Sequence, residues 1–234
     1  MLQDNDLGAI DFTVNARAKH IRVHILPNSL RITLPAKASQ KEAMDFVNSI
    51  RQKLIAKQAE LHKKREKNSV FIDENTSLKT LTFRVEVKRV TRENIFFSLK
   101  GDVLLIEIPQ SMNCADEKVQ FVCWKGIDHF LRREAKRLLP QRTTMLAKMH
   151  NFSISSVKIQ SSKSRWGSCS SQKIINLSFY LLLLPQQLID YVILHELCHT
   201  KEMNHSIKFW QWMNKVTDNK SDELKRELKK YSMP

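Results

Sequence analysis

The chain has 234 residues, a length that predicts one or two domains and a core that removes about 70% of the unfolded surface from water. Its 42% hydrophobic and 27% charged residues exclude a disordered chain, and its four glycines and six prolines exclude a collagen-like or linker-like one. The net charge of +15 favours an anionic partner such as nucleic acid, but lysine that only keeps the protein in solution accounts for it equally well.

Three features predict a cytoplasmic protein that does not enter a membrane. The longest apolar run, Phe179–Leu184, is far shorter than the ~20 residues that cross a bilayer. The first eleven residues lack the basic and apolar regions of a signal peptide. The cysteines include no C-x-x-C pair, so we expect them to be reduced thiols. They are Cys114, Cys123, Cys169 and Cys198.

The N-terminal region is expected to begin with a tail at residues 1–11. Apolar and polar residues then alternate at 21–25 and 30–34, which predicts a β-hairpin. After Ser39 the apolar residues recur every three or four positions. This pattern predicts a helix with Ser39 as its N-cap and Glu42 as the capping-box partner.

The segment 57–68 is polar and rich in lysine, and we interpret it as a solvated helix end followed by a connection. A nucleic-acid contact in this segment would lack the aromatic residues that stack on bases. Strands are predicted at 81–90, 95–99 and 103–108, the last two joined as a second hairpin. Residues 12–110 therefore form a β-rich N-terminal part with one long helix.

The C-terminal part, residues 111–234, is predicted to be mostly helical. Asp116 opens a long amphipathic pattern that Pro140 should kink or end, with a second helical piece reaching about Met149. Two strands around a polar loop and a final helical region follow, at 155–160, 173–179 and 185–234.

One segment of the final helical region carries a metal-binding pattern. His195 and His199 lie four residues apart, so on a helix their imidazoles face the same point. Glu196 can reach a water molecule at that point without itself being a ligand, and H-E-x-x-H is the zinc hydrolase arrangement for this reason. With eight histidines in the chain, this pattern with a further histidine after five intervening residues occurs by chance about 0.0005 times.

The residues 188–194 before the motif are almost all apolar, which predicts a buried helix whose polar groups a metal ion would compensate. His205 is the favoured third ligand, because Ser206 can cap a new helix and the intervening turn brings His205 back toward the metal. The fourth position is then left to water. Glu202 is the alternative third ligand, or its carboxylate orients a histidine ligand by a hydrogen bond to the imidazole ring. Cys198 offers sulfur, but a role as a small apolar filler is favoured.

Several short motifs resemble those of one family. They are the run Ser164–Cys169 (SRWGSC), the triplet Asp190–Val192 (DYV), and the HELCH motif with the N-H-S and F-W residues that follow it. These are similar to the YgjP-like metal-dependent hydrolases. That family belongs to the zincin-like metallopeptidases and shares the H-E-x-x-H-x5-H pattern with the SprT-like proteases. The resemblance spans about residues 12–215.

The resemblance implies one zinc ion and Glu196 as the catalytic base, although other divalent ions also suit imidazole ligands. The ligands that it implies are His195, His199 and His205. Arg165 and Trp166 of the SRWGSC run are candidates for substrate binding, since Arg165 can stabilise an oxyanion or bind a carboxylate or phosphate. A purely structural role fits Arg165 and Trp166 equally well, in a loop whose Trp166 side chain packs against the motif helix.

Together these features predict an α+β protein in which a zincin-like catalytic part, with the H-E-x-x-H helix facing the strand at 173–179, follows the β-rich part. The predicted function is a zinc-dependent metallopeptidase that cleaves a peptide or protein substrate with a zinc-activated water and Glu196 as general base. Two alternatives use the basic surface. They are a metal-dependent hydrolase of nucleotide phosphoanhydrides and a nucleic-acid-associated protein with a vestigial metal site.

Overall fold

The computed structural model describes residues 2–26, 29–68 and 70–234, and the chain divides into two compact units, Met1–Ser69 and Val70–Pro234. Both units mix helices and strands, so the α+β class is confirmed. The structure does not divide near residue 110, where the sequence placed the boundary. The strands before that position share one hydrophobic core with the helices after it, and this core keeps them in the same unit.

The first unit is built on a four-stranded sheet of order β1-β2-β4-β3, in which β2 and β4 are parallel. Its elements are β1 (Leu2–Asp4), β2 (Gly8–Val14), β3 (Arg22–Leu26), β4 (Ser29–Leu34), α1 (Gln40–Ser49) and α2 (Arg51–Asn68). The predicted hairpin is β3 and β4, although its turn at 27–28 lies outside the described residues. The capping box of Ser39 and Glu42 is confirmed. A solvated helix end followed by a connection was predicted at 57–68; the structure shows helix throughout this segment, as the end of α2.

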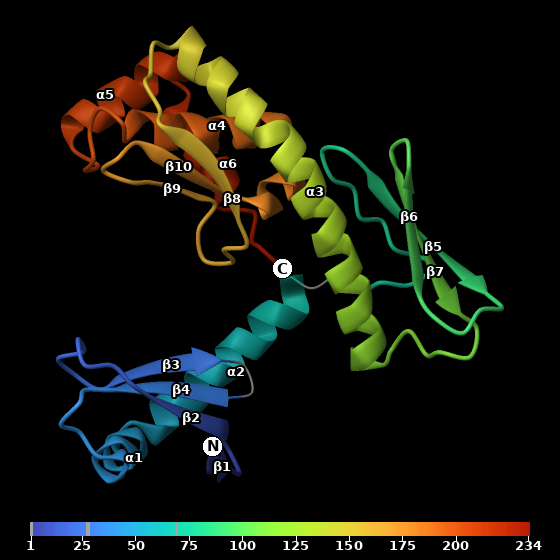
Figure 1. The fold of residues 1–234 in the computed structure, drawn as a ribbon, viewed down its shortest axis with the longest axis vertical. Helices are drawn as coiled ribbons and strands as arrows, with labels where there is room; N and C mark the ends of the chain where they lie inside the picture. The colour runs from blue at the N-terminus through green and yellow to red at the C-terminus, as the bar shows by residue number, and fades with distance from the viewer. Residues whose placement is uncertain (1, 27–28, 69) are drawn as a thin grey trace. The chain divides into compact units, whose positions relative to one another are not determined.

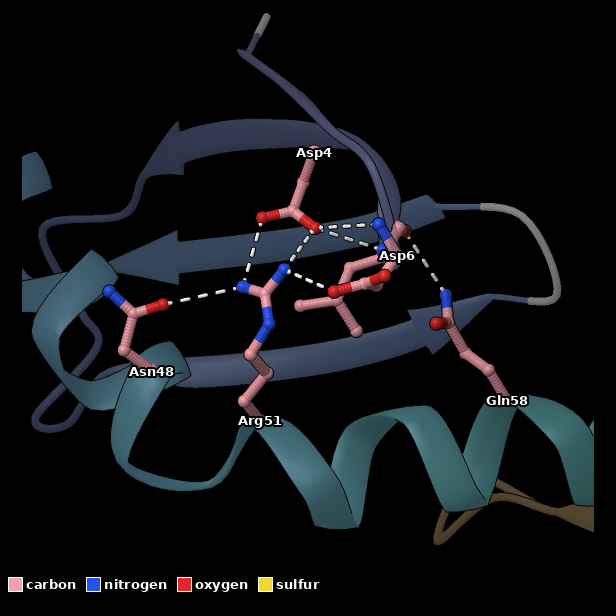
Figure 2. Close-up of polar contacts among 6 residues, drawn as sticks. Asp4, Asp6, Asn48, Arg51 and Gln58 are labelled. Atoms are coloured by element: carbon pink, nitrogen blue, oxygen red, sulfur yellow. Dashed lines mark hydrogen bonds and ion pairs between the residues drawn. The ribbon is translucent and has the colours of Figure 1, made fainter.

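The prediction of a tail over the first eleven residues is wrong, because both acidic and apolar side chains there are held by the rest of the unit. Leu7 is 1% exposed. The guanidinium of Arg51 donates hydrogen bonds to Asp4 at 2.7 and 3.0 Å and to Asp6 at 2.8 Å (Figure 2). About two turns further along α2, the side-chain amide of Gln58 donates a hydrogen bond to the backbone carbonyl of Leu7 at 3.2 Å. Asp4 and Asp6 of the predicted tail are therefore partners of helix α2.

The second unit contains two three-stranded sheets among its described residues, ordered β5-β7-β6 and β8-β10-β9. In each, the central strand has one parallel and one antiparallel neighbour. The strands are β5 (Arg84–Val90), β6 (Phe96–Lys100), β7 (Val103–Pro109), β8 (Ser156–Gln160), β9 (Gly167–Cys169) and β10 (Ile174–Ser178). Figure 1 shows α3 (Glu117–Met149) running between these two sheets. The predicted hairpin is β6 and β7, whereas the short strand β9 was not predicted.

Helix α3 is a single helix of 33 residues that begins after the N-cap Asp116 and passes through Pro140. The predicted two pieces are therefore one. A proline inside a helix costs about 3 kcal/mol. Buried side chains on both sides of it, among them Leu131, Leu139 and Leu146, anchor the helix in the core, and this packing outweighs the local cost.

The chain ends in a helical region, as predicted. It comprises the 3-10 helix η1 (Phe179–Leu183), α4 (Gln186–Cys198), α5 (Ile207–Val216) and α6 (Ser221–Leu228). Helix α4 packs on β9 and β10, while α5 and α6 pack on α4. Within the described parts of the chain, no helix has both the length and the apolar character that a membrane crossing requires.

Candidate active site

Helix α4 positions the first part of the site. Its N-cap is Pro185, and its residues from Leu188 to Leu194 are buried apart from the half-buried Asp190. The apolar helix thus fixes the direction of the motif at its C-terminal end, which carries His195 and Glu196. His199 is the C-cap and keeps a helical conformation, so its ring lies one turn beyond His195, with ring centroids 4.9 Å apart.

The turn after α4 returns the third histidine to this point. Ser206 caps α5 by accepting a hydrogen bond from the backbone of Phe209. His205, directly before this cap, places its Nε2 atom 3.1 Å from Nε2 of His195. One ring nitrogen from each of the three histidines, including His199, lies within 4.8 Å of the others. The structure therefore brings together the three residues that the sequence singled out.

Phe209 forms the apolar support of this cluster and was not predicted. It is fully buried, and its ring centroid lies 4.6 to 4.9 Å from those of all three histidines. A ring packed against all three imidazoles restricts their rotation and keeps water from that side. The cluster is thus held by packing as well as by the helix.

The donor set fits a divalent metal ion. Three neutral imidazole nitrogens form the ligand set of several catalytic zinc sites, and two such ligands of a tetrahedral ion lie about 3.3 Å apart, close to the separation of His205 and His195. Nδ1 of His199 lies 3.1 Å from the backbone carbonyl of Glu202, a contact that leaves Nε2 of His199 as the ligand atom. Burial, reinforced by the neighbouring His199 and His205, lowers the pKa of His195 to about 3, so this ring is neutral and able to bind a cation.

The two alternative ligands lie outside the cluster. Glu202 contacts His199 through its backbone carbonyl, while its carboxylate forms no hydrogen bond or ion pair with the described residues. Cys198 is fully buried, and burial raises the pKa of its thiol to about 12. It therefore fits the role of a small apolar core residue.

Glu196 lies beside the cluster with its carboxylate against strand β9. The side chain is 6% exposed, and it packs so closely on Gly167 that a Cβ atom there would lie 2.7 Å from Cγ and 2.8 Å from Oε1 of Glu196. Burial raises the pKa of Glu196 to about 7, and the positive charge of Arg165 opposes this shift. The carboxyl group is thus able to exchange a proton near neutral pH.

A cavity of about 680 Å³ opens beside His195, Glu196 and His205. The sequence-predicted residues Arg165 and Trp166 line it, so both lie at the site. The residues that were missed come from three helices and the segment after α6: Tyr191, Trp210, Lys225, Lys229 and Tyr231. Tyr191 carried a usable signal, because it precedes His195 by one helical turn and therefore shares its face.

The fold and site have the features of a metallopeptidase: a helix bearing H-E-x-x-H, a third histidine from the following turn, and a cavity beside them. The chain belongs to the YgjP-like family, because the model of this family, described as "YgjP-like, metallopeptidase domain", matches residues 19–231. Among solved structures, the crystal structure of the metallopeptidase zymogen of Pyrococcus abyssi abylysin is similar at 24% identity and a TM-score of 0.35. That match covers 40% of this chain and 97% of the other. No curated protein matches the chain.

Proposed function

We propose that this chain is a zinc-dependent metallopeptidase with a zincin-like site. The observation that carries the proposal is the convergence of ring nitrogens from His195, His199 and His205 within 4.8 Å of one another. When bound by these three residues, zinc would supply Lewis-acid chemistry, polarising a carbonyl group and lowering the pKa of a water molecule. Membership of a metallopeptidase family supports a peptide or protein as the substrate.

In this proposal Glu196 moves the proton. Its carboxylate accepts a proton from the attacking water and returns it to the departing amine, which needs a group that exchanges protons near pH 7. The burial of Glu196 beside Gly167 supports this role, because it both raises the pKa and fixes the carboxylate. Arg165 would bind negative charge that develops on the substrate, a role that its position in the cavity lining supports.

The open edge of strand β9 favours a substrate in an extended conformation. It pairs with β10 on one side, and on the other side it has no strand partner among the described residues. A peptide in an extended conformation can form backbone hydrogen bonds with such an edge. Gly167, at the start of β9, contacts Glu196 and so brings this edge next to the proposed base.

The test compares two Glu→Gln variants of the zinc-loaded protein on a denatured protein substrate. Glu196→Gln should lower turnover by at least about 100-fold, because general base catalysis is lost, while zinc stays stoichiometric. Glu93→Gln, in the exposed turn before β6, removes a carboxylate far from the motif in the sequence and should leave turnover unchanged. Equal turnover in the two variants would contradict the proposal.

A further inference from the structure

The cavity beside the histidines is lined by positive side chains that form no ion pair with the described residues. Arg165, Lys225 and Lys229 line it, and Glu196 is the only carboxylate among the described residues of the lining. None of the three cations forms an ion pair with a described residue, whereas Arg84, Arg137 and other cations of the same unit do. Their charges are therefore available to a ligand.

Lys225 is held close to the histidine cluster by an aromatic ring. Its Nζ atom lies 4.2 Å from the ring centroid of Trp210, a cation–π contact. Trp210 in turn lies 6.1 Å from the ring of His205 and 6.5 Å from that of His195. The contact positions the ammonium group without using its N–H donors on a carboxylate, so these donors remain free for a substrate.

The second lysine lies one turn further along the same helix. Lys225 belongs to α6, and Lys229 is its C-cap in helical conformation, so the two residues are four positions apart on one face. Their backbone separation along the axis is about 6 Å. Alternate residues of an extended peptide are about 6.7 Å apart and also share a face. Asp222, three residues before Lys225 and therefore on the same side of α6, forms no ion pair with either lysine.

We propose that this cavity selects peptides with acidic side chains at alternate positions, in an acidic-x-acidic pattern close to the scissile bond. Lys225 and Lys229 each bind one carboxylate of such a peptide, and the aromatic rings of Trp166 and Trp210 contact the remainder. The inference rests on the proposed peptidase function and adds the substrate class. Exposed ion pairs of this kind contribute modestly to affinity, and salt screens them.

The experiment uses a set of ten-residue peptides in which a Glu-Ala-Glu triplet moves along the sequence, each matched with its Gln-Ala-Gln counterpart. For at least one position the zinc-loaded protein should cleave the Glu peptide with a kcat/KM about tenfold higher, which is about threefold per exposed pair. The difference should shrink as ionic strength rises. Binding is measured separately, by the tryptophan fluorescence of the Glu196→Gln variant, which binds without cleaving.

Charge reversal provides the sharper test. The double variant Lys225→Glu/Lys229→Glu, which reverses both charges, should abolish the preference for acidic peptides and give a preference for a matched Lys-Ala-Lys peptide. Lys230→Gln, a neighbouring lysine that does not line the cavity, should keep the original preference. The reversal is a gain that a merely unfolded variant would not show.

The outcomes separate the inference from the proposed function. Glu196-dependent cleavage of Glu and Gln peptides at equal rates would overturn the inference and leave the peptidase intact. Binding that prefers Glu peptides and reverses in Lys225→Glu/Lys229→Glu, without any cleavage, would support the inference and contradict the peptidase. A nucleoside triphosphate that binds in a Lys229-dependent manner, where no peptide does, would overturn the inference in favour of a phosphate site.

Discussion

Replacing Gly167 with alanine should impair catalysis far more than stability. The added Cβ would lie 2.7 Å from Cγ of Glu196, whereas ordinary contact begins at 3.4 Å, so the Glu196 side chain must retreat by about 0.7 Å. A displacement of about 1 Å in a catalytic group costs up to about 100-fold in rate, which predicts a 10- to 100-fold loss of kcat in Gly167→Ala. The neighbouring atoms are those of a flexible side chain, so the free energy of unfolding should fall by only about 1 kcal/mol.

The assay is peptide turnover by zinc-loaded Gly167→Ala, accompanied by zinc content and thermal unfolding. Zinc should stay stoichiometric, since Gly167 contacts Glu196 rather than the histidines. Gly101→Ala is the matched control, because a Cβ there meets nothing within 4 Å. It should cost about 1 kcal/mol through the left-handed backbone at Gly101 and leave turnover unchanged. Turnover within twofold of wild type in Gly167→Ala would refute the view that this glycine positions the base.

The remaining predictions concern two arginines, Arg51 and Arg142, whose ion pairs hold helices in place. Arg51→Met should lower the thermal stability of the first unit and speed hydrogen exchange in β1, since Arg51 binds Asp4 and Asp6. Hydrogen bonding to Arg51 lowers the pKa of Asp4, so the ionised Asp4 carboxylate stabilises the folded unit fully above about pH 4, and this stabilisation is lost as the pH falls below that value. Arg51→Met should therefore lose less stability on acidification than wild type does. Identical acid unfolding of the two proteins would contradict this prediction. Asp190→Asn should cost about 2 kcal/mol in denaturant unfolding, because Asp190 accepts two hydrogen bonds from Arg142 that join α4 to α3, and a cost near zero would contradict it.

The local parts of the site could be predicted because their geometry follows from spacing along the chain. His195 and His199 share a helical face at four residues' distance, and Ser206 caps a new helix in the way that serine commonly does. The return of His205 followed from these two facts. The capping box at Ser39 and the start of α3 at Asp116 were predicted for the same reason.

The non-local parts could not be predicted from spacing. Lys225 and Lys229 reach the cavity only because α6 packs on α4, and Phe209 supports the histidines only because α5 folds back on them. The unit boundary was missed because α2 carries its polar pattern through to its end and gives no break in composition. The break predicted at Pro140 is absent for a different reason: the burial of helix α3 on both sides of the proline outweighs the local preference of proline to end a helix.

The zinc content of purified protein after dialysis against a weak chelator, measured for wild type, Glu196→Gln and His205→Ala, tests most directly whether three histidines hold a zinc ion. We expect one zinc ion per chain in wild type and Glu196→Gln, and a zinc affinity at least about 100-fold lower in His205→Ala, because a ligand is lost. Stoichiometric zinc held with unchanged affinity by His205→Ala, or no zinc in wild type, would contradict this expectation.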